Sequence, residues 1–297
     1  MKILIVGLVK NFQVLRLTEE GEKRGHTVDA CKTGDLIIYS DKRIFNPKIS
    51  GLDITSYDLI YSFATKRRWE WYLTFLYLSK KYKTKVVNQR IIDKKSGVFL
   101  TPISIIDYYR QTKSRIDYPK SVTFYTTKGI PEIKEKIKFP MIVKSSVGKQ
   151  GKLVFKVDDE KELEEKIRQL QVTKDAIVAR EFIPNDGDVR VFTIGYKAIG
   201  AMKRTPKEGE FRSNISQGGS GLVFDLEKHQ EVAKLAEKEA RITKTDIAGV
   251  DVIINKETNK PYILEINSNP QFQGLEKYTG LNIAGKIIEY FEELVSR

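Results

Sequence analysis

Two acidic residues interrupt apolar runs near the C-terminus, and their spacing could place them side by side. Asp251 lies in one apolar run, Glu265 and Asn267 lie in the next, and the polar residues 256–260 separate the runs. This pattern predicts a β-hairpin. If its turn is centred on Thr258, residue 251 pairs with residue 265, and alternation places all three polar side chains on one face.

Carboxylates that lie opposite each other on neighbouring strands repel, so this hairpin predicts a bound cation. The oxygen atoms of Asp, Glu and Asn suit Mg²⁺, and Mg²⁺ suits polyphosphates. The alternative is an edge hairpin whose two acids face solvent. The same alternation predicts a buried opposite face made of Val250, Val252, Leu264 and Ile266.

A second segment rich in glycine, serine and lysine could contact phosphate. Residues 145–152 follow Lys144 and separate two predicted strands, 139–144 and 153–157, which should form a hairpin. Backbone N–H groups in such a loop can bind phosphate oxygens. No predicted helix follows the loop directly, so it is not a Walker A motif. An ordinary hairpin turn is the alternative.

Two further segments have the chemistry of a nucleotide or substrate site. Residues 179–183 end a predicted strand, where the backbone could pair with adenine and Glu181 could accept hydrogen bonds from ribose. Residues 207–219 form a glycine-rich loop. Its Arg212 can bind a carboxylate or phosphate through two hydrogen bonds, and its glycines allow a close approach of the backbone.

Together these segments resemble the ATP-grasp superfamily, and within it the RimK-like glutamate ligases that modify a ribosomal protein, an amino-group carrier protein or a cofactor. The resemblance extends over residues 137–290, and before residue 90 it is only a pattern match. It rests on four stretches: FRSNISQGG at 211–219, AGVD at 248–251, LEIN at 264–267 and GLEKYTGLNIAGK at 274–286.

The resemblance implies a role for each candidate residue. Two Mg²⁺ ions, or Mn²⁺ in their place, would be held by Asp251, Glu265 and Asn267. ATP would be bound by Lys94, Lys144, Gly148, Gln150, Gly151, Glu181, Phe182, Ile183 and Lys203. The phosphates and the acyl phosphate would be contacted by Arg190, Arg204 and Arg212, with Asn214 beside the metal ions.

The expected enzyme is an ADP-forming ligase that activates a carboxylate as an acyl phosphate and joins it to an amine. The resemblance implies glutamate as the amine and a protein C-terminus or a similar acidic group as the acceptor. A glutamate ligase acting on a small cofactor is one alternative, and a non-enzymatic nucleic-acid-binding protein is another. The chain departs from the family at Lys203, at Gln271 and over residues 98–121, which leaves the acceptor open.

The composition indicates which partners and which cellular compartment to expect. The chain has 297 residues, with 52 basic and 39 acidic side chains and a net charge of +13. This surplus favours acidic partners, although solvated helix faces also account for such charge. The single cysteine, Cys31, excludes a disulfide within the chain and, with two histidines, argues against a zinc site. We expect a cytoplasmic protein that needs neither membrane nor nucleic acid.

The pattern of elements predicts an α/β protein with an ATP-grasp fold, a mixture of α/β and α+β parts. Residues 1–90 should form a doubly wound domain with a parallel sheet. Residues 91–180 should form the central subdomain with the phosphate flap, and residues 181–297 the C-terminal subdomain with the metal site. A helix is expected from Asp225 to about residue 241 and another over 283–295. The apolar helix 69–82 packs in a core or at a subunit interface, and we expect a dimer or tetramer.

Overall fold

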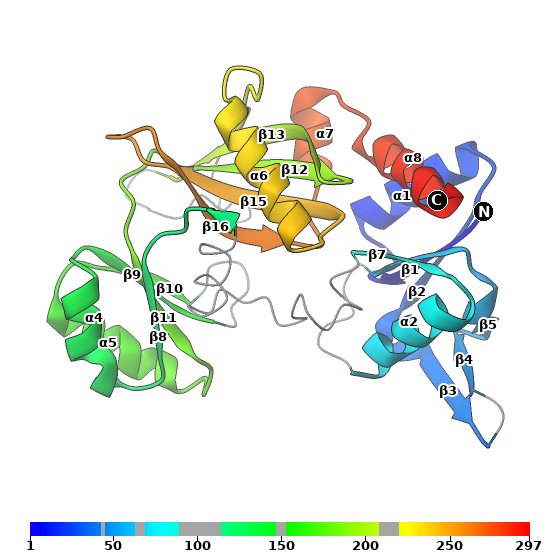
Figure 1. Cartoon of the computed structure of the whole chain (residues 1–297), viewed down its shortest axis with the longest axis horizontal. Helices are drawn as coiled ribbons and strands as arrows, with labels where there is room; N and C mark the ends of the chain where they lie inside the picture. The colour runs from blue at the N-terminus through cyan, green and yellow to red at the C-terminus, as the bar shows by residue number, and fades with distance from the viewer. Residues whose placement is uncertain (43–44, 63–68, 89–113, 147–152, 208–219) are drawn as a thin grey trace.

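The computed structural model describes residues 1–42, 45–62, 69–88, 114–146, 153–207 and 220–297. The described strands form four sheets. Figure 1 shows these elements gathered into three parts, with the sheet of β12 to β16 between the other two. No described helix has the length and apolar character needed to cross a membrane.

The N-terminal part is built on a parallel sheet with the strand order β2-β1-β6-β7. Its strands are β1 (Lys2–Gly7), β2 (Thr27–Lys32), β6 (Leu59–Ser62) and β7 (Lys85–Val87). Its helices are α1 (Phe12–Lys23), α2 (Trp69–Lys81) and the C-terminal helix α8 (Ile283–Ser296). Ile3 and Ile5 pack in one core with α1 and α8, and Leu4 and Val6 pack in another with α2. The predicted parallel sheet with helices on both faces is therefore confirmed.

Two features of this part were not predicted. The C-terminal helix α8 returns to the N-terminal sheet and lies beside α1 (Figure 1). A small antiparallel sheet is formed by β3 (Leu36–Ser40), β4 (Phe45–Ile49) and β5 (Leu52–Asp53). On α2, Trp71 and Phe75 are buried while Leu73 is 56% exposed, so one side of this helix packs in the core.

The central part is an antiparallel sheet with the order β10-β9-β11-β8. Its elements are β8 (Ser121–Phe124), α4 (Ile130–Lys136), β9 (Met141–Ser145), β10 (Val154–Val157), α5 (Glu160–Gln171) and β11 (Ile177–Glu181). The predicted hairpin of β9 and β10 is confirmed. Met141 and Val143 pack against α4 and α5, so alternation turns Lys144 to the opposite, open face.

The C-terminal part is an antiparallel sheet with the order β14-β13-β12-β15-β16. Its elements are β12 (Asp188–Ile194), β13 (Lys197–Thr205), β14 (Ser220–Val223), α6 (Gln230–Ile242), β15 (Ile247–Ile254), β16 (Pro261–Asn267) and α7 (Gln273–Thr279). Helix α6 covers the face that carries Val189, Val191 and Val250. Residues between these valines therefore point to the other face of the sheet.

The predicted start of α6 is wrong. The helix begins at Gln230 and its N-cap is His229, five and four residues after Asp225. The Asp225 carboxylate instead accepts hydrogen bonds from the N–H groups of Glu227 (3.0 Å) and Lys228 (3.3 Å). It therefore stabilises a turn before the helix, which is a common local role of aspartate.

Asn88 joins the N-terminal sheet to the C-terminal sheet. It follows β7, is fully buried, and has a left-handed backbone with φ of 63°. Its side-chain nitrogen donates to the Ser268 carbonyl (2.8 Å), and its side-chain oxygen accepts from the Ile247 N–H (2.9 Å). One side chain thus fixes the start of β15 and the segment that follows β16.

Replacing Asn88 with alanine should lower the free energy of unfolding by about 2–4 kcal/mol, because two buried backbone groups lose their partners. Asn259→Ala is the matched control, since Asn259 also has a positive φ (56°) but lies exposed in the β15–β16 turn. Chemical denaturation of both variants isolates the buried contacts. Equal losses in the two variants would contradict this role of Asn88.

Candidate active site

Four charged side chains meet on the face of the C-terminal sheet that α6 leaves uncovered: Asp188, Arg190, Arg204 and Asp251. We call this group the ion cluster. Arg190 donates to Asp251 through Nε and Nη2, both at 2.7 Å, and Arg204 Nη2 lies 3.0 Å from the same carboxylate. Arg204 also binds Asp188 through Nε (2.8 Å) and Nη2. The two positive and two negative charges balance.

Strand register explains why these residues meet. Arg190 lies opposite Asp251 in the β12–β15 pair, and Asp188 lies opposite Arg204 in the β12–β13 pair. Asp188 and Arg190 are two residues apart on β12, so their side chains share one face. Gly187 just before them has φ of 111°, and a Cβ there would lie 2.2 Å from the Arg204 carbonyl oxygen. Glycine is therefore required at the entry to this strand.

Burial and the arginines set the charge of the acids. Burial by itself would raise the pKa of Asp251, but Arg190 and Arg204 outweigh it and hold that pKa well below its usual range. Burial raises the pKa of Asp188, and Arg204 counters part of this rise. Asp251 is only 4% exposed. Its carboxylate nevertheless stays charged at neutral pH because the two guanidinium groups compensate the charge.

Glu265 and Asn267 extend this face of the sheet. Asp251 pairs with Glu265, as predicted, and Gly249 pairs with Asn267. The Asn267 side-chain nitrogen donates to Glu265 Oε1 at 2.9 Å, and Glu265 is exposed. In the described part of the chain no three His, Cys, Asp or Glu side chains group as metal ligands. The available set is thus two carboxylates and one amide, whose hard oxygens fit Mg²⁺.

One detail of the predicted hairpin is wrong. The register shifts between Asp251 and Val252, which pairs with Ile263. Leu264 is therefore the extra residue of a β-bulge, and Ile263 instead packs beneath α6. The Leu264 carbonyl accepts a hydrogen bond from Arg180 Nη1 (3.0 Å).

The hydrogen bond from Arg180 to Leu264 joins the central sheet to the C-terminal sheet, which carries the ion cluster. Arg180 lies opposite Ile142, and Lys144 is two residues further along β9, so Arg180 and Lys144 lie on the open face of the central sheet. The end of β11 supplies Glu181, whose carboxylate accepts from the Lys120 N–H at 3.2 Å. Next to it Lys156 Nζ lies 5.0 Å from the Phe182 ring centroid, and Ile183 is buried.

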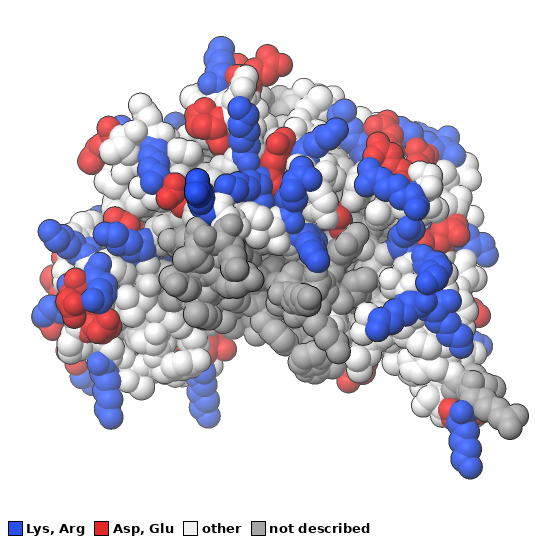
Figure 2. All heavy atoms as spheres, in the orientation of Figure 1, with Lys and Arg blue, Asp and Glu red and all other residues white. Residues whose placement is uncertain are grey.

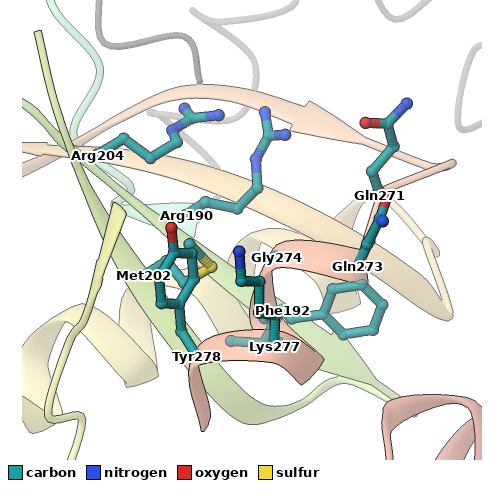
Figure 3. Close-up of a pocket in the computed structure, with 10 residues that line it drawn as sticks. Arg190, Phe192, Met202, Arg204, Gln271, Gln273, Gly274, Lys277 and Tyr278 are labelled. Carbon is teal, nitrogen blue, oxygen red and sulfur yellow. The ribbon is translucent and has the colours of Figure 1, made fainter. Parts of the chain in front are cut away.

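A cavity of about 430 Å³ lies beside the ion cluster, between β12 and β13 on one side and α7 on the other. Figure 3 shows the Arg190 and Arg204 side chains facing it across from the Lys277 ammonium and the Tyr278 hydroxyl. Its walls are lined by Arg190, Phe192, Met202, Arg204, Gln271, Gln273, Gly274, Leu275, Lys277 and Tyr278. The cavity can hold a small polar substrate with an aliphatic part.

Two contacts shape this cavity. A Cβ on Gly249 would lie 2.9 Å from the Pro270 side chain and 3.5 Å from Arg190 Cδ, so the glycine allows both residues to pack over β15. Helix α7 is tied to the N-terminal part by Arg16, whose Nε donates to Glu276 Oε2 at 3.3 Å.

The structure places five of the predicted residues on one face of the C-terminal sheet: Arg190, Arg204, Asp251, Glu265 and Asn267. The sequence argument missed Asp188, although its spacing of two residues from Arg190 was an available signal. Lys203 is a correction: Met202 and Arg204 line the cavity, so alternation places Lys203 on the other face of the sheet, away from it. Six predicted residues lie outside the described residues: Lys94, Gly148, Gln150, Gly151, Arg212 and Asn214.

Comparison with known proteins decides the family. The model of the RimK-like ATP-grasp domain matches residues 109–291. This chain belongs to the RimK-like ATP-grasp family. It is therefore an ADP-forming carboxylate–amine ligase that uses ATP.

Curated relatives match almost the whole chain. A protein of Vibrio vulnificus (strain YJ016) named "Probable alpha-L-glutamate ligase" is 31% identical over 309 residues, covering 99% of this chain and 96% of the relative. A protein of the same name from Psychromonas ingrahamii is 31% identical over 312 residues, covering 99% and 95%.

Solved structures share the fold of this RimK-like chain at low sequence identity. The ATP-grasp ligase PsnB, solved with a precursor variant, Mg and ADP, has a TM-score of 0.74 at 17% identity and covers 99% of this chain and 98% of its own. A RimK domain protein from Sphaerobacter thermophilus has a TM-score of 0.69 at 17% identity, with 98% and 99% covered. These likenesses confirm the predicted ATP-grasp fold.

Asp251→Asn should lower the free energy of unfolding by about 3–5 kcal/mol, because it leaves buried arginines without a full counter-charge. Glu265→Gln is the control and should stay within about 0.5 kcal/mol of wild type, since Glu265 is exposed. Chemical denaturation at neutral pH measures both. Equal stability of Asp251→Asn and wild type would contradict the ion cluster as described.

The pH dependence follows from the depressed pKa of Asp251. The stabilisation is fully present above the unfolded pKa of about 3.9, and it is lost as the pH falls toward the folded pKa. The difference in unfolding free energy between wild type and Asp251→Asn should thus be constant above about pH 5 and shrink below about pH 4. Denaturation curves over this range test it; a difference that grows on acidification has the wrong sign.

Proposed function

We propose that this ligase joins L-glutamate to a carboxylate of an acidic peptide tail, through an acyl phosphate made from ATP. The relatives named as glutamate ligases support glutamate as the amine. Similar folds solved with precursor peptides support a peptide acceptor. Figure 2 shows Lys and Arg side chains over all three parts of the visible face, and the net charge of +13 favours an acidic partner.

The metal site in this proposal is formed by Asp251, Glu265 and Asn267. Their oxygens face one side of the β15–β16 hairpin and would hold two Mg²⁺ or Mn²⁺ ions. Bound there, the ions supply charge neutralisation for phosphoryl transfer.

The nucleotide would lie between the central and C-terminal sheets. Lys144 on the open face of β9 would contact phosphates, and Glu181, Phe182 and Ile183 at the end of β11 would bind adenosine. The hydrogen bond from Arg180 to Leu264 supports this placement, because it brings the two sheets together at the metal-site strand. Lys94, Arg212, Asn214 and the flap residues Gly148, Gln150 and Gly151 are proposed to complete the site.

The chemistry has two steps. An oxygen of the acceptor carboxylate attacks the γ-phosphorus of ATP, the bond to ADP breaks, and an acyl phosphate forms. The glutamate amine then attacks the acyl carbon, loses a proton, and phosphate leaves. Arg190 and Arg204 face the cavity where this charge develops and would stabilise it by hydrogen bonds.

The observation that carries the proposal is the position of the acids. Asp251 and Glu265 lie directly opposite each other on neighbouring strands, and two arginines that can bind phosphate lie beside them. Opposed carboxylates next to guanidinium groups fit a metal–phosphate site, because each charge gains a partner when the metal nucleotide binds.

The test is a phosphate-release assay with ATP, Mg²⁺, L-glutamate and a glutamate-terminated peptide, with mass spectrometry of the peptide. Wild type should add glutamate and form ADP. Glu265→Gln should lose about a hundredfold or more of the rate, since a metal ligand is lost without loss of fold. Glu257→Gln in the exposed turn of the same hairpin is the matched control and should be fully active.

Two results would count against the proposal. Near-normal activity of Glu265→Gln would refute the metal assignment. Addition of glutamate to a small cofactor but to no peptide would assign the other acceptor class.

A further inference from the structure

The cavity beside the ion cluster carries one positive charge that no described acidic side chain compensates. Its charged lining residues are Arg190, Arg204 and Lys277, and no Asp or Glu of the described chain lines it. The two arginines are balanced by Asp251 and Asp188 behind them. Lys277 makes no ion pair with a described residue, and its ammonium lies 5.6 Å from the centroid of the Tyr278 ring.

Helix α7, which carries Lys277, is held in place by contacts with neighbouring elements. Glu276 accepts from Arg16 and also from the Ala284 N–H (3.0 Å), which orients α7. Gly280 ends the helix with φ of 70°. Figure 3 shows the Lys277 ammonium pointing toward the side of the cavity that carries Arg190. Helix α7 thus presents to the cavity an ammonium group that has no ion-pair partner among the described residues.

The rest of the lining defines the shape of a ligand. Phe192, Met202 and Leu275 form an apolar wall, while Gln271 and Gln273 add amide groups near the start of α7. Methylene groups of a ligand would pack against the apolar wall, and a carboxylate would pair with the Lys277 ammonium. A short aliphatic chain that ends in a carboxylate combines the two.

We propose that Lys277 binds the side-chain carboxylate of a glutamate residue in the substrate and thereby selects glutamate over glutamine. This inference rests on the proposed function. The carboxylate belongs either to the incoming amino acid or to the terminal glutamate of the acceptor, and both present the same chemistry to Lys277.

The experiment compares Lys277→Met, Lys277→Arg and Lys286→Met. Methionine keeps much of the length and removes the charge, arginine keeps the charge, and Lys286 is an exposed control on α8 that does not line the cavity. Phosphate release is measured while L-glutamate, L-glutamine and a glutamate-terminated peptide are varied in turn. Calorimetry measures binding of L-glutamate and of the peptide to protein loaded with Mg²⁺ and a non-hydrolysable ATP analogue.

Lys277→Met should raise the KM for one carboxylate ligand about 10- to 100-fold, the effect of losing one hydrogen bond to a charged group. A higher KM for L-glutamate, with the preference over L-glutamine lost, assigns the incoming amino acid; a higher KM for the peptide assigns the acceptor. Affinity for the metal nucleotide should not change. Lys277→Arg should recover most of the affinity, and Lys286→Met should behave as wild type.

Unchanged KM values in Lys277→Met for both ligands would overturn the inference while leaving the proposed function intact. A wild-type protein without turnover would overturn the proposed function, and calorimetry would still decide on Lys277. Loss of L-glutamate or peptide binding in Lys277→Met supports the inference. Binding retained there, or absent for both ligands in wild type, refutes it.

Discussion

Buried charges on the open face of the C-terminal sheet must cancel, and this constraint organises the site. Asp251 is almost fully buried and is stable as an anion only because Arg190 and Arg204 hydrogen-bond to it. Arg204 in turn needs Asp188, whose place on β12 is set by the turn at Gly187. Removing any one of these charges leaves another buried without compensation, so the sheet and the site are specified together.

The other parts of the fold serve to position this face. Asn88 holds both the start of β15 and the segment after β16 to the N-terminal sheet. Arg180 binds the bulge at Leu264 and brings the central sheet close. Arg16 ties α7, which lines the cavity, to α1 of the N-terminal part. Contacts from both other parts of the chain therefore help to position this face.

The sequence predicted those features that depend on local pattern. Apolar runs located the parallel strands, and alternation around Thr258 paired Asp251 with Glu265. The sequence-based prediction failed where a contact between distant segments decides which way a side chain points. Leu264 was expected in the core, but it lies in a bulge whose carbonyl accepts a hydrogen bond from Arg180. Lys203 was expected at the nucleotide, but it lies on the opposite face of β13 from Arg204, which lines the cavity. The spacing of Asp188 and Arg190 shows that they share a face, but the pairing of Asp188 with Arg204, sixteen residues later, depends on strand register.

The central claim is that this face activates a carboxylate by phosphorylation. The direct measurement uses an acceptor peptide whose carboxylates carry heavy oxygen, followed by mass analysis of the phosphate released with ATP, Mg²⁺ and L-glutamate. In an acyl-phosphate route one carboxylate oxygen leaves with phosphate, so each glutamate added should yield one labelled phosphate and one ADP. Unlabelled phosphate, or release of AMP in place of ADP, would contradict the account.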